Sequence, residues 1–292
     1  MKNCKKFNFK NPVVTMGTFD GVHLGHQQVL KELKKKADLA GGESVVISYY
    51  HHPLETIHKK TFPYLLTEKD KKEILIKQSG IDHVIFLDFN ERIADMSPEQ
   101  FLKEIIIDEV GAREIIAGYD THFGRFRQGN YQFLKDHESK YNYSVSLVEP
   151  LKINNRIISS SLIRDFIREG DMIDVAKCLG RKYSVAGSVI TGHKIGRGMG
   201  FPTINVHPAD PNKLIPGIGV YICEVMLLNN KYQAVTNIGY SPTLKKTGIK
   251  EIETHILDFD SDVYSQSVEV VFHKKLREEK AFDSIDELVK EI

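Results

Sequence analysis

The sequence predicts two folds in one chain: an α/β fold with a doubly wound parallel sheet, then a small antiparallel β-barrel with a closing helix. In the first part, short apolar runs alternate with segments whose apolar residues recur at helical spacing, as in a parallel sheet covered by helices. In the last part, strand-like runs are separated by glycine and proline, which favours a barrel. We expect a first domain over residues 1–180 and a second over residues 181–292.

The composition favours an enzyme that acts on small molecules. Of 292 residues, 41% are hydrophobic, and 40 basic against 39 acidic residues leave a net charge of +1, so no overall field attracts nucleic acid or a membrane. No signal-peptide pattern precedes the first strand, and no apolar run approaches the about 20 residues that span a bilayer, so we expect a cytoplasmic protein. Cys4, Cys178 and Cys223 are scattered and odd in number, which indicates free thiols.

The segment 13–30, VVTMGTFDGVHLGHQQVL, predicts a buried strand, a glycine turn and a helix start. Such a turn leaves the first N–H groups of the helix unpaired, and these groups together with the helix dipole attract phosphate. His23 and His26 are three residues apart, so both rings lie on one face at a helix start, and Gly25 leaves room for a ligand. A pair of surface histidines and a metal-binding pair are the alternatives at this point.

The alternation of strand and helix continues after this segment. Strands are expected over residues 44–50, 82–87 and 115–118, and helices over residues 67–80 and 97–110. In a doubly wound sheet, ligands bind beyond the carboxyl ends of the strands, where His23 and His52 both fall. Further on, three serines precede a helical pattern in NRIISSSLIRDFIR, residues 155–168; capping explains one serine but not three together with Arg164.

The second domain is predicted from short strands and a glycine-rich loop. The strands are expected over residues 183–190, 204–206, 220–228, 232–238, 251–259 and 267–272, with a closing helix over residues 282–292. The loop 192–203 has four glycines and three basic residues, the composition of a phosphate-binding loop. It is neither a Walker A sequence nor a Rossmann fingerprint, because no G-K-[ST] closes it and strand-forming residues follow it.

Motifs in both halves of the sequence carry a family resemblance that covers essentially the whole chain. G-T-F-D-G-V-H-L-G-H, residues 17–26, resembles the signature of the bacterial bifunctional riboflavin kinase/FAD synthetases, whose first domain belongs to the HxGH nucleotidyltransferase superfamily. I-S-S-S-x-I-R, residues 158–164, resembles that domain's second motif. G-R-x-x-G-F-P-T-x-N, residues 196–205, resembles the riboflavin kinase signature, and N-I-G-x-x-P-T and E-x-H-x-L-D-F, residues 237–243 and 253–259, resemble its other motifs.

The resemblance implies roles for individual residues. Catalytic roles are implied for His23, His26, Arg164 and Glu253, the last as general base. Nucleotide binding is implied for Gly17, Phe19, Gly25, His52, Ser159, Ser160, Gly192, Lys194, Gly196, Gly200, Thr203 and Asn205. Thr203 and Asn205 are also the implied ligands of Mg²⁺ bound with ATP, because hydroxyl and amide oxygens suit a hard cation. Flavin binding is implied for Asp120, Phe123 and Arg277.

The chain departs from the family pattern at a few positions. The segment 117–124 resembles the family's G-x-D-F-x-F-G loop, which helps to hold FMN, but Thr121 replaces an aromatic residue. His51 stands where a proline is usual, Thr191 where a histidine is common, and Ser265 where a glycine is usual.

The function that the resemblance implies is the synthesis of flavin cofactors. The second domain would phosphorylate riboflavin with ATP to give FMN, and the first would transfer AMP from ATP to FMN, giving FAD and pyrophosphate. The expected partners are riboflavin, FMN and ATP, without nucleic acid or membrane, and self-association is left open. Two alternatives are a chain with only one of these activities, and a flavin-binding regulator acting on RNA or protein; the near-neutral charge speaks against RNA.

Overall fold

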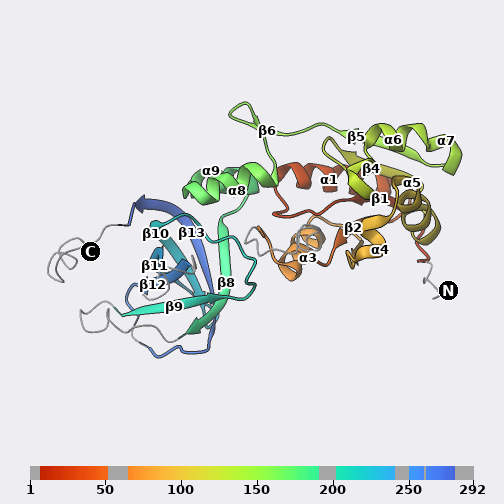
Figure 1. Ribbon diagram of the computed structural model, residues 1–292. Coiled ribbons are helices and arrows are strands. Elements are labelled where there is room, and N and C mark those ends of the chain that lie inside the picture. The colour runs from red at the N-terminus through yellow and green to blue at the C-terminus, as the bar shows by residue number, and fades with distance from the viewer. Residues whose placement is uncertain (1–6, 52–64, 191–201, 241–249, 260, 280–292) are drawn as a thin grey trace. The chain divides into compact units, whose positions relative to one another are not determined.

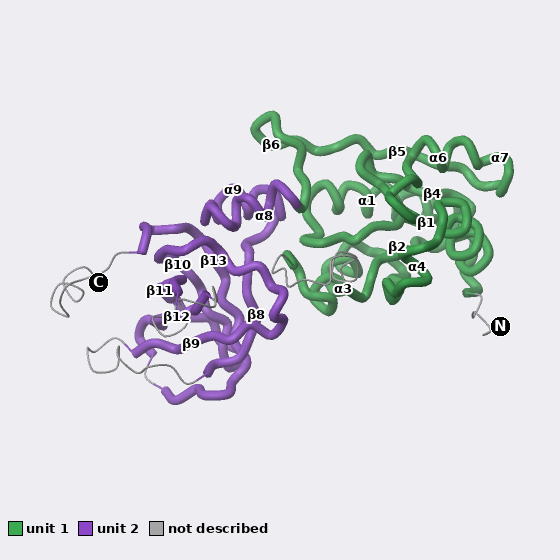
Figure 2. The backbone as a smooth tube through the Cα atoms, in the orientation of Figure 1, with its two compact units in different colours: residues 1–160 green, residues 161–292 purple. Residues whose placement is uncertain are grey.

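The chain forms two compact units, residues 1–160 and 161–292 (Figure 2). The computed structural model describes residues 7–51, 65–190, 202–240, 250–259 and 261–279. Each unit has its own sheet and its own core, so each is described by itself.

The first unit is built on a five-stranded parallel sheet in the order β3-β2-β1-β4-β5 (Figure 1). The strands are β1 Val13–Met16, β2 Ser44–Tyr49, β3 His83–Leu87, β4 Glu114–Gly118 and β5 Ser144–Val148. The predicted doubly wound sheet is confirmed, and four of its strands lie where the sequence placed them. The edge strand β5 was not predicted from the sequence.

Helices cover both faces of this sheet. Successive residues of a strand point to opposite faces, so neighbouring residues of one strand pack against different helices. On one face, Val13, Val46 and Ile116 pack against α1 and α3. On the other, Val14, Val45 and Ile115 belong to a core that includes residues of α4, η1 and α6. The helices are α1 Leu24–Leu39, α3 Lys69–Gln78, α4 Glu91–Asp95, α5 Pro98–Gln100, the π-helix η1 Phe101–Glu109, the 3₁₀ turn η2 Arg125–Arg127, α6 Tyr131–Asp136 and α7 Glu138–Tyr141.

The helix predicted over residues 97–110 begins as expected but is wound differently. Ser97 Oγ accepts the N–H of Gln100 at 3.1 Å, and Gln100 Oε1 accepts the N–H of Ser97 at 2.9 Å, which makes a capping box. Beyond Gln100 the chain is a π-helix. Apolar periodicity predicts a helix here but does not distinguish its hydrogen-bond spacing.

The second unit is a closed barrel with strand order β10-β11-β12-β9-β8-β13, which confirms the predicted barrel (Figure 1). Its strands are β8 Tyr183–Ile190, β9 Thr203–Pro208, β10 Gly219–Leu227, β11 Asn230–Tyr240, β12 Lys250–Ile256 and β13 Ser267–Arg277. A two-stranded hairpin, β6 Lys152–Ile153 and β7 Arg156–Ile157, precedes this unit. The closing helix predicted over residues 282–292 lies outside the described residues.

Two helices precede the barrel strands, α8 Ser160–Glu169 and α9 Met172–Leu179. The sequence predicts both in the first domain, whereas residues 161–179 pack with the barrel in the second unit. Gly217 explains the close approach: its N–H donates to Ile167 O at 2.9 Å, and an added Cβ would lie 2.2 Å from Arg168 O. Among the described residues, no helix is long and apolar enough to cross a membrane.

Cys223 lies in the barrel interior, among mostly apolar side chains. Along β10, Tyr221, Cys223 and Val225 are buried, with Glu224 pointing outward. Burial raises the pKa of the Cys223 thiol to about 12, so the thiol stays protonated and unreactive. Cys178 is also buried and free, as predicted, and Cys4 lies outside the described residues.

At the amino ends of β2 and β3, Asp82 joins neighbouring segments. Its Oδ2 accepts the N–H and the hydroxyl of Ser44, at 2.9 and 2.7 Å, and Lys34 Nζ lies 3.1 Å from Oδ1. Burial raises the pKa of Asp82, but the hydrogen bonds from Ser44 and Lys34 outweigh it, and the pKa lies below its usual value.

Asp82→Asn is therefore expected to lower the free energy of unfolding by about 1–2 kcal/mol at pH 7, mainly through the bonds to Ser44, since exposed ion pairs contribute little. Because the folded-state pKa is depressed, this stabilisation is present above the unfolded-state pKa of about 4 and is lost as the pH falls through the folded-state value. Urea unfolding at pH 7 and pH 3 tests this. An equal difference at both pH values would contradict it.

Candidate functional site

The turn after β1 has an unusual backbone. Phe19 and Val22 have φ angles of 49° and 40°, in the left-handed region that a β-branched valine rarely adopts. Such residues persist only where the surrounding structure holds them, and they concentrate at functional sites. The turn Gly17–Val22 leads directly into α1, the helix that bears the two histidines.

Buried Asp20 holds this turn from within. The side chain is 1% exposed, and its carboxylate accepts the N–H groups of Leu66 (2.9 Å) and Thr67 (3.1 Å). The backbone carbonyl of Asp20 accepts the hydroxyl of Ser160 at 2.9 Å. Asp20 therefore hydrogen-bonds the turn after β1 to residues 66–67 and to Ser160, two segments that are distant in sequence.

Buried Lys72 holds the same turn from α3. Its Nζ donates to Thr18 O at 3.2 Å and to Tyr49 O at 3.1 Å, and the residue is only 7% exposed. Ser48 Oγ also donates to Thr18 O, at 3.1 Å. These bonds join the carboxyl ends of β1 and β2, the edge where parallel sheets bind ligands.

The two histidines lie together at the start of α1. His23 is the N-cap, and its Nδ1 accepts the N–H of His26 at 3.3 Å, which leaves the proton of the neutral ring on Nε2. The rings are stacked with centroids 3.6 Å apart, and the ring of Phe19 is 5.0 Å from that of His26. The structure thus brings His23, His26 and Phe19 together.

Gly17 and Gly25 lie beside these rings. An added Cβ at Gly25 would approach the His23 ring to 3.2 Å and Ile158 O to 3.6 Å, and one at Gly17 would approach the Phe19 ring to 3.3 Å. Only small residues fit at these positions without displacing the rings. The dipole of the 16-residue helix α1 adds a positive field at the same end.

The other residues predicted for the first site fall into three groups. Ser160 begins α8, preceded by Ser159, and Arg164 is half-buried on the same helix. Asp120 is exposed. Phe123 is 3% exposed, and its ring packs in the core against Phe101 and Phe133, so it anchors the loop to the core. His52 lies outside the described residues, as do Gly192, Lys194, Gly196 and Gly200 of the second site.

On the barrel, strand register gathers the polar residues of the second site on the outer face. Glu253 of β12 is paired with Asn205 of β9 on one side and with Asn237 of β11 on the other. Ile252, Thr254 and Ile256 point into the barrel, so Glu253 and His255 point outward, as the predicted alternation requires. Asn237 belongs to a motif singled out in the sequence, but only the register shows that it flanks Glu253.

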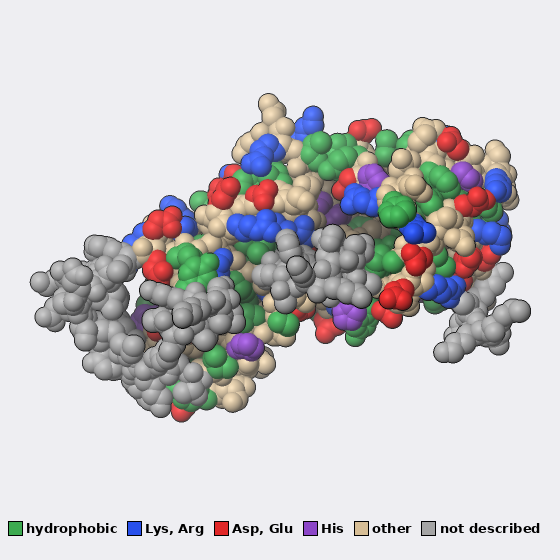
Figure 3. Space-filling view, viewed as in Figure 1, with side chains coloured by type: hydrophobic (Ala, Val, Ile, Leu, Met, Phe, Trp, Pro, Cys, Tyr) green, Lys and Arg blue, Asp and Glu red, His purple; other side chains and the backbone are tan. Residues whose placement is uncertain are grey.

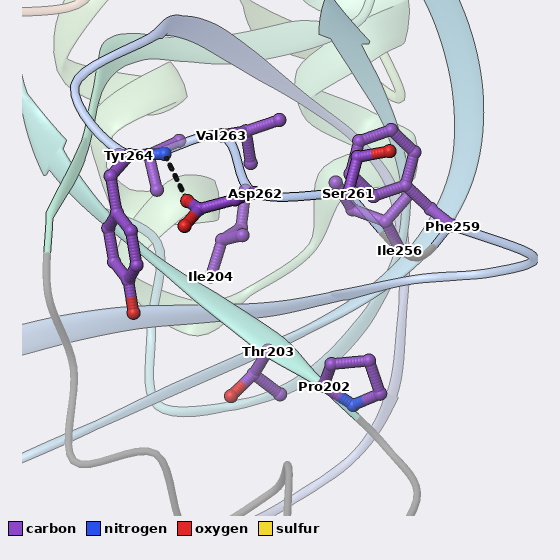
Figure 4. A pocket seen from close by; sticks show the side chains of 10 residues that line it. Pro202, Thr203, Ile204, Ile256, Phe259, Ser261, Asp262, Val263 and Tyr264 are labelled. Carbon is purple, nitrogen blue, oxygen red and sulfur yellow. Dashed lines mark hydrogen bonds between the residues drawn. The ribbon is translucent and has the colours of Figure 1, made fainter.

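Glu253 has a direct partner across the strands. Thr203 Oγ1 donates to Glu253 Oε1 at 2.7 Å, and His255 Nδ1 lies 2.9 Å from Pro202 O. Thr203 also lines a pocket with residues of the segments that follow β12 (Figure 4). Its walls are Val189, Pro202, Thr203, Ile204, Ile256, Phe259, Ser261, Asp262, Val263 and Tyr264.

Arg277 ends β13, where it pairs with Val220 of β10. Val220 in turn pairs with Asn237, which pairs with Glu253, so the register places Arg277 in the same row of residues across the barrel. Its Nη1 donates to Glu278 O at 3.2 Å.

The comparisons with known proteins agree with this geometry in both units. The model of the FAD synthetase family matches residues 5–162, and that of the riboflavin kinase family matches residues 179–292. Relatives named bifunctional riboflavin kinase/FMN adenylyltransferase include one from Pseudomonas fluorescens, 34% identical over 94% of this chain and 88% of its own length. One from Buchnera aphidicola subsp. Schizaphis graminum is 36% identical over 99% of this chain and 93% of its own length.

The chain belongs to the bifunctional riboflavin kinase/FMN adenylyltransferase family. Bacillus subtilis has a further relative of that name, 34% identical over 96% of this chain and 89% of its own length. The chain is also similar to a crystal structure described as a macrolide-efflux protein from Streptococcus pneumoniae, with a TM-score of 0.86 and 29% identity over 97% of this chain and 91% of that chain. This likeness shows that the two-unit fold is shared with a known structure.

Sequence reasoning missed two residues of the first site. Asp20 lies within the G-T-F-D-G run, but its partners Leu66 and Thr67 are more than forty residues away in the chain. Lys72 stands in a charged helix, KDKKE, where nothing local distinguishes the buried lysine from its exposed neighbours.

Asp20→Asn is expected to weaken the first unit, because the amide Nδ2, a donor, would replace one carboxylate oxygen that accepts a backbone N–H, such as Oδ2, which accepts the N–H of Leu66 at 3.2 Å. A loss of about 1–3 kcal/mol in the free energy of unfolding follows from leaving a buried group unsatisfied. Urea unfolding compares the variant with Asp38→Asn, which changes an exposed carboxylate of α1. Equal stability of the two variants would show that Asp20 does not hold the turn.

Proposed function

We propose that the two sites divide the work of flavin cofactor synthesis, with adenylyl transfer at the α1 histidines and riboflavin phosphorylation at Glu253. Family membership makes the chain an enzyme that phosphorylates riboflavin to FMN and adenylylates FMN to FAD. What remains to be assigned is which residues perform each step. The observation that carries the assignment is the contrast in chemistry between the sites: stacked histidines at a helix N-terminus in one unit, and a carboxylate bonded to a hydroxyl in the other.

In the adenylyl-transfer site, the nucleophile is the phosphate of FMN, which is already an anion and needs no base. The task of the protein is to place it in line with the α-phosphorus of ATP and to stabilise the growing charge. His23 Nε2–H and His26 are placed to donate hydrogen bonds to phosphoryl oxygens at the positive end of α1. Ser159, Ser160 and Arg164 would hold the phosphates that leave as pyrophosphate.

In the kinase site, the nucleophile is a neutral alcohol, whose proton must be accepted as the bond to phosphorus forms. Glu253 suits this role because its carboxylate, which accepts the hydroxyl of Thr203, has lone pairs for further acceptor bonds. Asn205 and Asn237 on either side are placed to orient the substrates, and Arg277 in the same row would contact the flavin. The pocket beside Thr203 would receive part of a substrate (Figure 4).

The donor set of the kinase site fits Mg²⁺. Thr203 and Asn205 offer hydroxyl and amide oxygens on one face, which suit a hard cation that keeps several waters. Bound with ATP, Mg²⁺ would neutralise phosphate charge. Among the described residues, no cluster of three or more His, Cys, Asp or Glu could hold a metal by itself, so substrate phosphates would complete the coordination.

We infer further that the protein works in the cytoplasm on small molecules and binds neither nucleic acid nor membrane. Its net charge is +1, and on the face shown in Figure 3 Lys and Arg side chains are spread among Asp and Glu side chains over both units. On this face charges of both signs lie side by side, whereas nucleic-acid-binding proteins cluster Lys and Arg along one face. Self-association is left to a measurement of the molecular mass in solution.

His26→Ala is expected to reduce FAD formation from FMN by about a hundredfold or more, because a donor to the transition-state phosphate is removed. FMN formation from riboflavin by the same sample should change less than twofold. Both products are followed by chromatography with saturating ATP and Mg²⁺. A loss of both activities in a folded variant would contradict the division between the sites.

Glu253→Gln is expected to give the reverse result, since glutamine keeps the shape but accepts no proton. FMN formation should fall by about a hundredfold or more, and FAD formation from added FMN should persist. Glu251→Gln, which changes another outward carboxylate of the same strand, is the matched control and should leave both rates near those of the wild type. Equal losses in the two variants would exclude Glu253 as the base.

A further inference from the structure

The barrel strand β9 begins directly after a proline that cannot donate to the sheet. The register between β9 and β12 ends at the pair His255–Thr203, and β9 itself starts at Thr203. The residue before it, Pro202, has no N–H group with which to continue the pairing to β12. The backbone at the start of β9 therefore needs another contact to fix its position.

The side chain of His255 supplies this contact. Its Nδ1 lies 2.9 Å from Pro202 O. Because a carbonyl oxygen can only accept, Nδ1 carries a proton and donates it to this bond. His255 is half-buried and stands directly opposite Thr203, so its ring reaches one residue beyond the end of the backbone pairing. The bond fixes the peptide group that joins Pro202 to Thr203.

The side chain of Thr203 is held from the same strand. Its Oγ1 donates to Glu253 Oε1 at 2.7 Å. Glu253 and His255 are two residues apart on β12, so both point to the outer face of the barrel. Since the hydroxyl proton is directed at Glu253, the lone pairs of Oγ1 face elsewhere and can bind a cation. Two outward side chains of β12 thus fix the backbone and the hydroxyl of one residue.

The position of this peptide group matters for substrate binding. Pro202 and Thr203 both line the pocket beside the kinase site (Figure 4). A rotation of the peptide group between them would move the Thr203 hydroxyl and change the wall of the pocket together. Side chains that orient a metal ligand change metal affinity or activity by about 10- to 100-fold when they are lost.

We propose that His255 is a positioning residue of the kinase site: by donating to Pro202 O, it holds the hydroxyl of Thr203 where Mg²⁺ binds with ATP. His255 acts through Thr203 and does not exchange a proton with the substrate. The inference rests on the proposed kinase site and deepens it, since it names the side chain that keeps a proposed metal ligand in place.

The kinetic test compares His255→Asn, His255→Gln and His255→Ala in the full chain. Asparagine places an amide N–H group near the position of Nδ1, glutamine places one near that of Nε2, and alanine has none. In the Ala and Gln variants, KM for ATP and the half-saturating Mg²⁺ concentration of FMN formation should rise about tenfold or more. The Asn variant should stay within about threefold of the wild type, because it keeps the donor. KM for riboflavin should not change in any variant.

Two controls separate positioning from a general loss of structure. His137→Ala removes a bond of the same kind in the first unit, where Nδ1 lies 2.8 Å from Phe133 O, and should leave the kinetics of FMN formation unchanged. FAD formation from added FMN should stay at the wild-type rate in all three His255 variants, because it takes place in the other unit.

Nitrogen-15 NMR of the full chain, labelled at its histidines, tests the bond itself without nucleotide or metal. The signals of His255 are assigned by their loss in His255→Asn. We expect a proton on Nδ1 in the wild type. A ring that carries its proton on Nε2 alone would overturn the inference, because such a ring cannot donate to Pro202 O.

The kinetic results can also overturn it. An unchanged KM for ATP in His255→Ala, an equal loss in the Asn and Ala variants, or an equal rise in KM for riboflavin would each show that the bond does not position Thr203. These outcomes differ from a failure of the proposed function, in which Glu253→Gln would keep the wild-type rate of FMN formation.

Discussion

The first unit depends on holding the turn Gly17–Val22 in a conformation that its residues do not favour. Phe19 and Val22 are left-handed. The buried Asp20 carboxylate ties the turn to the N–H groups of Leu66 and Thr67, and the buried Lys72 donates to Thr18 O. Unpaired, either buried charge would be costly, so these bonds and the turn conformation stabilise one another. The consequence is that α1 begins at His23, with both rings and the helix dipole directed at one place.

The second unit has a different fold, a closed antiparallel barrel, and presents different functional groups. The kinase step proposed for this unit needs a group that accepts a proton, and the barrel presents the Glu253 carboxylate in a row of residues that successive strands contribute to its outer face. Because the interior residues Thr254 and Ile256 fill the core, the strand alternation alone directs Glu253 outward. Two chemistries that need different groups are thus carried by two independently cored units of one chain.

The sequence predicted what local periodicity encodes. The strand and helix starts follow from apolar spacing and from caps such as Ser97, and the positions of β1, β2 and the barrel strands agree with the structure within a few residues. Periodicity does not predict which distant segments of the chain contact one another. Lys72 contacts the turn after β1 only because α3 folds against the carboxyl ends of β1 and β2, which its sequence alone does not show.

The most direct test is a crystal structure of the full chain with a non-hydrolysable ATP analogue, Mg²⁺ and FMN. We expect the phosphates of the analogue at the N-terminus of α1, within hydrogen-bond distance of His23 and His26. We also expect Val22 to keep a positive φ, and Asp20 and Lys72 to keep their backbone partners. A nucleotide bound away from α1, or a turn that rearranges when nucleotide binds, would contradict the claim that the turn is held ready for phosphate.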